Sequence, residues 1–226
     1  MNKLLLLALL ATFSIATIWM APYFGAAEYS EQIRTLRLPR ATLAWFSGGS
    51  LAVAGLLMQT LLRNDLATPF TLGVASSASF GAFVCFAFPA ISATMWAPPL
   101  LGFICAIATI ALIIKLGSSN LGHNGILLVG ITINFVFGAA LMIVRHLAPP
   151  YRMTKLEHWL MGSIETSSFD PAWVVATAAL LCSAIIWTKR HDLDQYSFDM
   201  KVAQARGVNV PELMNVGLAT SGFLTA

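Results

Sequence analysis

The sequence predicts an all-α polytopic membrane protein, with six complete transmembrane helices and the start of a seventh. Of its 226 residues, 58% are apolar and only 10% are charged, whereas soluble domains carry about 25% charged residues. Mean hydropathy is +0.76, and the charged residues fall in the gaps between apolar runs. Because one span takes roughly 20 apolar residues, we expect a single membrane domain over residues 1–226.

The predicted spans follow the uncharged stretches of the chain. The stretch from Leu66 to Ile114 is too long for one helix, and we divide it at Pro89 and at Pro98-Pro99, because adjacent prolines disfavour a helix interior. A cleaved secretory signal is the alternative for the first stretch, but its apolar run exceeds the usual 7–15 residues, which favours a retained helix. The six spans are Leu4–Ala27, Ala41–Leu62, Phe70–Phe88, Pro99–Lys115, Asn124–Val144 and Pro171–Thr188.

The most polar stretch, 189–212, separates the sixth span from a final apolar run, Leu213–Ala226. At about 1.5 Å per residue this run reaches roughly 21 Å, short of a hydrocarbon core about 30 Å thick, so we expect the sequence to end within a seventh span. Asp199 suits the N-cap of a short helix that continues through Arg206, Gly207 suits its left-handed end, and Pro211 suits the first turn of the next helix. Two short helices on the membrane surface, suited to docking a partner, are predicted, with a solvated loop as the alternative.

Small residues line one face of the second predicted span. Gly48, Ala52 and Gly55 follow the spacing i, i+4, i+7, and Gln59 continues that face. Helices in lipid associate through small residues and interhelical hydrogen bonds, so this face, like Gly73-Ser77-Gly81 in the next span, is predicted to contact other helices.

A second interpretation concerns the polar residues within the spans. Gln59, together with Thr132 and Asn134 of the fifth span, would face a polar route through the bundle. Buried amides also join helices, and the two interpretations remain open at this point.

Several classes of function are disfavoured by what the sequence lacks. None of the ten acidic residues lies within a predicted span, whereas ion-coupled carriers generally need intramembrane ionisable groups. The sequence has no phosphate-binding loop, no H-E-x-x-H and no Cys or His at metal-ligand spacing. We therefore expect no catalytic residues, no metal site and no cofactor, and the absence of a basic block argues against a nucleic-acid partner.

Three arginines precede the second span: Arg34, Arg37 and Arg40. Pro39 suits the first turn of that helix, which would place Arg37 and Arg40 near the membrane surface. They would either extend to lipid headgroups or bind carboxylates of a partner protein. Orientation stays open, because seven basic residues fall on one side and six on the other.

The order of these motifs resembles the permease subunits of binding-protein-dependent ABC importers for iron–siderophore, haem and vitamin B12. Asp65 stands where that family usually has proline, Ser77 where it has glycine, and Arg206 where it has an apolar residue. The matching residues are Arg37-Leu-Pro-Arg40, Gly48, Gly55, Gln59, Leu62-Arg63-Asn64, Leu66-Ala67, Pro69, Leu72-Gly73-Val74, Trp159-Leu-Met-Gly162-Ser163, Ala203 and Gly207-Val208.

The resemblance implies an orientation and a set of partners. The N-terminus would be cytoplasmic, and Arg37 and Arg40 would receive acidic residues of a substrate-binding protein on the outer side. Residues 189–212 would be the cytoplasmic coupling-helix loop, and short helices from Asp199 to about Asn215 would press into an ABC ATPase subunit. The contact residues would be Asp199, Met200, Ala203, Arg206 and Gly207.

The resemblance also implies a transport cycle. A second permease subunit, identical or different, would complete a pathway lined partly by Thr132 and Asn134, in the inner membrane of a bacterial cell. The expected cargo is a ferric siderophore. The family has ten spans, so this sequence would be truncated at its C-terminus. An ion-coupled secondary carrier, or another polytopic transporter, is the alternative function.

Overall fold

The computed structural model describes residues 3–24, 30–87, 97–117, 122–149, 154, 157, 164, 166 and 168–225, and the regular elements among them are all helical. The all-α prediction is therefore confirmed. The helices form two compact units. One comprises Met1–Gly49 with Ile164–Leu180, and the other comprises Ser50–Ser163 with Leu181–Ala226.

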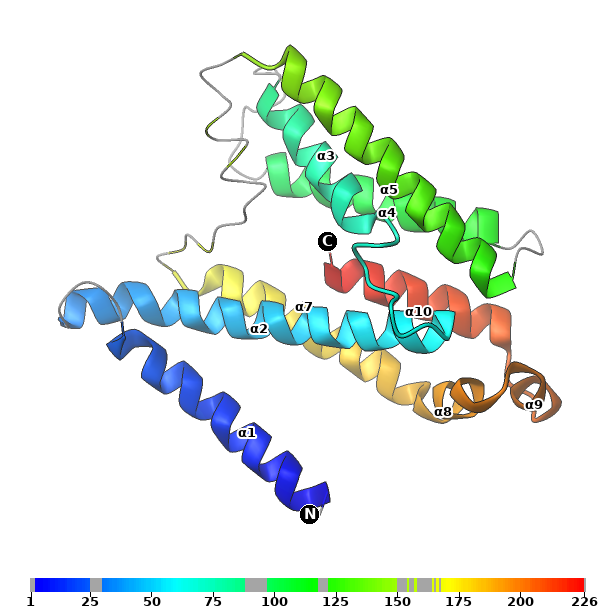
Figure 1. The fold of residues 1–226 in the computed structure, drawn as a ribbon. Coiled ribbons are helices and arrows are strands. Elements are labelled where there is room, and N and C mark those ends of the chain that lie inside the picture. Colours follow the sequence, from blue (N-terminus) through cyan, green and yellow to red (C-terminus); the bar gives the residue numbers. More distant parts are fainter. Residues whose placement is uncertain are drawn as a thin grey trace. The chain divides into compact units, whose positions relative to one another are not determined.

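The first unit contains α1 (Lys3–Met20), the 3-10 turn η1 (Ala21–Tyr23), and the first parts of α2 (Glu31–Leu62) and α7 (Asp170–Thr188). Helix α1 runs directly into η1 (Figure 1). The indole Nε1 of Trp45 donates a hydrogen bond of 2.6 Å to Ser14 Oγ. This bond joins α1 to α2.

Helix α2 begins earlier than the uncharged stretch predicts. Ser30 Oγ accepts a hydrogen bond from the Ile33 amide at 3.3 Å, so the helix begins at Glu31 rather than at Ala41. The placement of Pro39 in the first turn was therefore wrong, because Pro39 is buried inside the helix. A stretch without charged residues indicates which part of a helix suits the hydrocarbon core. The N-cap residue decides where the helix starts.

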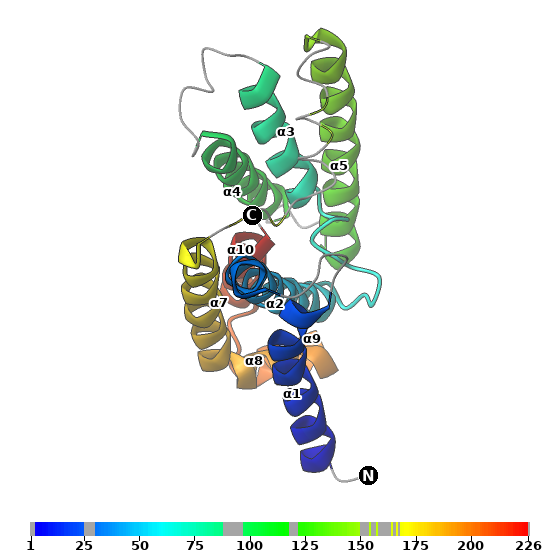
Figure 2. The same ribbon diagram turned by 90° about the vertical axis from the view of Figure 1, so that its left-hand side faces the viewer.

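The second unit is built around α3 (Val74–Ala87), α4 (Ala97–Gly117) and α5 (Gly122–Leu147) (Figures 1 and 2). Its α3–α4 contact depends on glycine: a Cβ at Gly81 would lie 2.6 Å from the Leu101 carbonyl oxygen. Helix α10 (Val210–Thr225) packs against α4. A buried core joins these helices to the polar segment; it includes Met58, Leu61, Leu72, Ile110, Ile133, Tyr196, Ala203, Val210 and Leu218.

Four described helices are long and apolar enough to cross a membrane: Glu31–Leu62, Ala97–Leu116, Gly125–Leu147 and Asp170–Thr188. Two further apolar helices are shorter, Ala8–Tyr23 and Val74–Ala87. The third predicted span begins at Val74 rather than Phe70, because turns occupy the preceding residues. The count of six spans stays a prediction.

The polar segment holds one helix more than its motifs indicate. Helix α8 (Arg190–Phe198), which was not predicted, precedes the short helix α9 (Met200–Ala205). The predicted second short helix and the seventh apolar run are one continuous helix, α10, which begins at Val210. Placing a boundary between Glu212 and Leu213 was therefore wrong, because a change from polar to apolar side chains does not interrupt a helix.

Candidate functional site

Helix α9 is held by the two motifs that the sequence indicates for it. Asp199 Oδ1 accepts hydrogen bonds from the amides of Lys201 at 2.7 Å and Val202 at 3.0 Å. Because these bonds, that from Val202 foremost, favour the charged carboxylate, they lower the pKa of Asp199. Gly207 closes the helix with φ +88°, the left-handed conformation that glycine adopts without steric cost. The predicted cap and the predicted helix end are both confirmed.

The two faces of α9 have different environments. Ala203 is fully buried and belongs to the core of the second unit. Met200 is half-buried, whereas Arg206 and Gly207 are exposed. Of the predicted contact residues, Ala203 thus faces inward, and the Asp199 carboxylate is engaged as a cap.

The exposed face of α9 contains residues that the sequence analysis did not single out. They are Lys201, Val202, Gln204 and Ala205. Spacing could have identified them, because a single buried residue in a short helix leaves the residues on its other side exposed. With Arg206 they form the exposed α9 face: two cations, one amide and two apolar side chains.

Helix α8 is fastened to the end of α2 by two hydrogen bonds that the sequence did not predict. The hydroxyl of Tyr196, which is fully buried, donates to the Leu61 carbonyl oxygen at 3.0 Å. Burial raises the pKa of Tyr196 to about 12, so the hydroxyl keeps its proton at neutral pH. In the other direction, Arg63 Nη2 donates to the Phe198 carbonyl oxygen at 3.1 Å. In the sequence, the feature that indicates α8 is the i, i+3 spacing of Leu193 and Tyr196.

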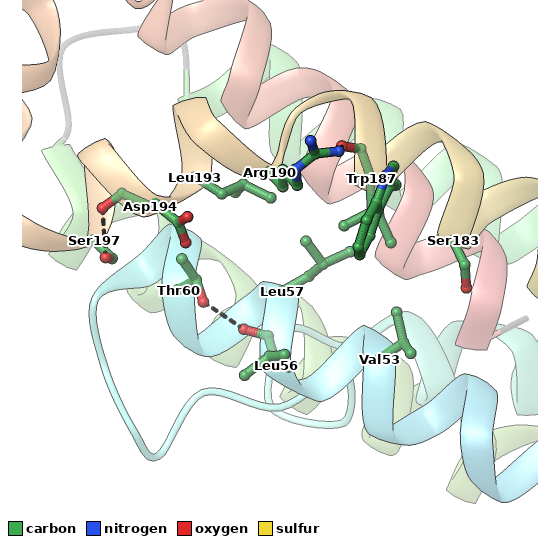
Figure 3. A pocket seen from close by; sticks show the side chains of 11 residues that line it. Val53, Leu56, Leu57, Thr60, Ser183, Trp187, Arg190, Leu193, Asp194 and Ser197 are labelled. Carbon is green, nitrogen blue, oxygen red and sulfur yellow. Dashed lines mark hydrogen bonds between the residues drawn. The ribbon is translucent and has the colours of Figure 1, made fainter. Parts of the chain in front are cut away.

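A groove of about 420 Å³ lies between the end of α2, the end of α7 and α8 (Figure 3). Apolar residues form most of its wall, and Arg190, Asp194 and Ser197 lie along its α8 side. The Arg190 guanidinium lies 4.6 Å from the centre of the Trp187 ring, a cation–π contact. The lining residues are Val53, Leu56, Leu57, Thr60, Ser183, Ile186, Trp187, Arg190, Leu193, Asp194 and Ser197. The groove holds no histidine, and the described part of the chain contains no cluster of three metal-binding side chains.

The predicted docking arginines both bind backbone carbonyls within the first unit. Arg37 Nη1 donates to Pro22 O at 3.1 Å, and Arg40 Nε donates to Thr166 O at 3.2 Å. These bonds join α2 to η1 and to Thr166, which precedes α7. Docking to a partner stays a prediction for both side chains.

The glycine face of α2 has open space beside two of its glycines. A Cβ at Gly48 or at Gly55 would meet nothing within 4 Å. Gln59 uses its side-chain amide locally, donating from Nε2 to Asp65 O at 3.0 Å. A contact of this face with another helix therefore stays a prediction.

The two candidates on α5 face different surroundings. Thr132 is exposed and donates to Leu128 O at 2.9 Å, whereas Asn134 is half-buried, with its backbone beside Gly73. Residues two apart lie about 200° apart around a helix, so Thr132 and Asn134 cannot line the same face. The Trp159–Ser163 motif lies outside the described residues.

Comparison with known proteins defines the class first. A solved structure titled "An inward-facing conformation of a putative metal-chelate type ABC transporter" matches with a TM-score of 0.84 and 26% identity, over 95% of this chain and 70% of that one. The fold is thus that of an ABC transporter membrane subunit, a multi-pass membrane protein. The model of the FecCD transport family matches residues 3–226, and the chain belongs to this family.

Its relatives include permeases with different named cargoes. The molybdate import system permease protein MolB of Haemophilus influenzae is 30% identical over 87% of this chain and 58% of its own. The vitamin B12 import system permease protein BtuC of Salmonella arizonae is 24% identical over 83% and 56%. A putative ABC transporter permease protein of Methanocaldococcus jannaschii is 27% identical over 90% and 61%. The chain therefore spans about three-fifths of the length of the relatives it matches.

Proposed function

We propose that this chain is the membrane-spanning subunit of an ABC importer that moves a metal chelate into the cell, driven by ATP hydrolysis in a separate subunit. The observation that carries the proposal is the family match along residues 3–226. Within the metal chelates, ferric siderophores are the cargo we expect from the sequence resemblance.

In this proposal the coupling element is α9 with its flanking helices. The exposed α9 face would bind the ATPase subunit, with Lys201 and Arg206 offering positive charge to acidic side chains there. The N-terminus and α9 would then lie on the cytoplasmic side of a bacterial inner membrane. A second permease subunit would complete the pathway.

Arg37 and Arg40 would receive a substrate-binding protein on the opposite side. Support comes from Arg40, which donates through Nε to Thr166 O. A guanidinium has five N–H donors, so with Nε bonded to Thr166 O the terminal nitrogens of Arg40 would be the donors offered to a carboxylate. Replacing both arginines by glutamate is expected to weaken docking of the binding protein at least tenfold at low salt, because attraction becomes repulsion.

The matched control for this docking test is Arg37→Lys with Arg40→Lys, which keeps the charge and removes the two-pronged geometry. We expect an intermediate loss of affinity for the lysine pair. Titrating binding protein onto vesicles that contain the transporter measures both variants, and unchanged affinity of the glutamate pair at low salt would contradict this docking role.

Uptake by reconstituted vesicles tests the function itself. The chain would be combined with an ATPase subunit and a binding protein, and radioactive iron would be supplied as ferrichrome. We expect iron to accumulate only when ATP is supplied on the side of the membrane that carries the ATPase subunit. A proton gradient is not expected to replace ATP. Uptake driven by a proton gradient without ATP would contradict the proposal. Competition by cobalamin or molybdate would assign the transporter a different cargo.

A further inference from the structure

The C-terminal end of α2 and the joint between α8 and α9 hold one another through two hydrogen bonds of opposite direction. Tyr196 of α8 donates to Leu61 O of α2 at 3.0 Å, and Arg63, directly after α2, donates to Phe198 O of α8 at 3.1 Å. We name these four residues the α2–α8 clamp. All four belong to the second unit.

Each bond of the α2–α8 clamp gives a hydrogen-bond donor to a carbonyl oxygen at the end of the other helix. The last four carbonyl groups of a helix have no partner within the helix. Leu61 lies in the last turn of α2, and Phe198 is the last residue of α8. Tyr196 is fully buried. Loss of its hydroxyl would therefore leave the Leu61 carbonyl oxygen without this hydrogen bond.

Arg63 stands where the backbone would favour another residue. Its φ is +48°, and it is the one described residue other than glycine with positive φ. After a helix, this conformation usually belongs to glycine. This backbone is strained for an arginine, and the bond from its side chain to Phe198 O can offset part of that strain.

The α2–α8 clamp lies next to the start of α9. Asp199, which follows Phe198, caps α9, and the Tyr196 hydroxyl also lies 3.7 Å from Met214 Sδ of α10. Ala203 of α9 packs in the same buried core as Tyr196 and Leu61. Through α8 and this shared core, α9 is joined to the end of α2.

We propose that Tyr196 and Arg63 are positioning residues that fasten α9 to α2, so that movement of an ATPase subunit bound to α9 is passed to α2 and not absorbed by a flexing loop. This inference rests on the proposed function. Neither side chain touches cargo or nucleotide in this role. Both act through the helix ends that they join.

The first test measures the attachment directly. Spin labels at Ala52→Cys on α2 and Gln204→Cys on α9, both exposed positions, would report the distance distribution in lipid nanodiscs, with Cys85, Cys105 and Cys182 replaced by alanine. Tyr196→Phe removes only the hydroxyl, and Arg63→Gly removes the guanidinium while suiting the left-handed backbone. Each is expected to raise the displaced population about threefold to tenfold, the equivalent of one lost hydrogen bond.

Tyr23→Phe, on an exposed tyrosine of the first unit, is the matched control and should leave the distribution unchanged. Arg63→Lys, which keeps a donor, should restore part of what Arg63→Gly loses. A distribution that both Tyr196→Phe and Arg63→Gly leave unchanged would overturn the α2–α8 clamp.

The second test measures what the attachment does. With the ATPase subunit bound, we expect Tyr196→Phe to leave ATP hydrolysis unchanged and to lower the cargo moved per ATP several-fold. A merely structural role would lower hydrolysis and uptake together, and equal losses would overturn the positioning role. If the unaltered chain binds no ATPase subunit, the proposed function fails, whereas the label distances still decide whether the clamp exists.

Discussion

Gly73 shows how much one backbone position decides in this molecule. Its φ is +77°, and a Cβ there would lie 2.9 Å from the Asn134 backbone nitrogen and 3.0 Å from Ile133 Cγ2. Both the turn before α3 and the contact with α5 thus need a residue without a side chain. The sequence marks Gly73 as one of several small residues and as part of the Leu72-Gly73-Val74 motif, but neither pattern indicates these contacts.

Gly73→Ala is therefore expected to destabilise the protein by about 3 kcal/mol, the sum of left-handed strain and an overfilled contact. Gly55→Ala is the matched control, because nothing lies within 4 Å of that position. Alanine inside a helix is expected to stabilise by about 0.5 kcal/mol there. Thermal unfolding in detergent measures both variants. Equal unfolding temperatures would show that the contact at Gly73 is absent.

Single residues differ in how far the sequence predicts them. Asp199 and Gly207 act within a few residues of themselves, as cap and helix end, so local spacing was sufficient. Tyr196 and Arg63 act on backbone atoms 135 residues away, and no local pattern specifies such a partner. The clustering of Arg37 and Arg40 in the sequence was enough to single them out. It did not predict their hydrogen bonds to Pro22 O and Thr166 O.

At the scale of elements, α9 separates its structural face from its exposed face. Ala203 is buried and the Asp199 carboxylate is used as a cap, so replacing either would disturb the helix itself. Lys201 is exposed in the first turn of α9. A negative charge there suits the helix N-terminus better than a positive one.

Lys201→Glu is thus expected to keep α9 intact while weakening association with an ATPase subunit at least fivefold, because it reverses one charge of the exposed α9 face. Arg34→Glu is the control. It makes the same change of charge near the start of α2, away from α9, and should leave association unchanged. Co-purification at two salt concentrations measures both. Equal retention of the ATPase subunit by the two variants would argue against α9 as its contact.

The boundaries of the helices followed rules other than hydropathy. Helix α2 begins at Glu31, directly after the Ser30 cap, and passes through Pro39. Helix α10 begins at Val210, directly after Asn209, whose Oδ1 accepts a hydrogen bond from the Glu212 amide at 3.3 Å. In both cases the helix extends beyond the apolar residues that a membrane would cover. Hydropathy located the apolar segments, and capping side chains decided where the helices began.

At the scale of the whole molecule, the proposed orientation places the two ends of α2 on opposite sides of the membrane. A single cysteine at Gln204 is expected to react with a membrane-impermeant maleimide only after the cells are opened. A single cysteine at Ser30 is expected to react in intact cells. Native Cys85, Cys105 and Cys182 lie in apolar helices and would be replaced by alanine beforehand. The reverse labelling pattern would contradict the orientation.

The sequence by itself determined the class of this protein: uncharged apolar segments, small-residue spacing and the order of its motifs specified an all-α membrane subunit, because these properties depend on composition and on near neighbours. Only the tertiary structure decided which carbonyl Tyr196 binds, that Asn134 lies beside Gly73, and that a Cβ at Gly55 would meet nothing within 4 Å whereas one at Gly73 would meet Ile133 and Asn134. Such pairings depend on how distant segments pack, and a buried polar group takes whichever partner that packing brings within reach.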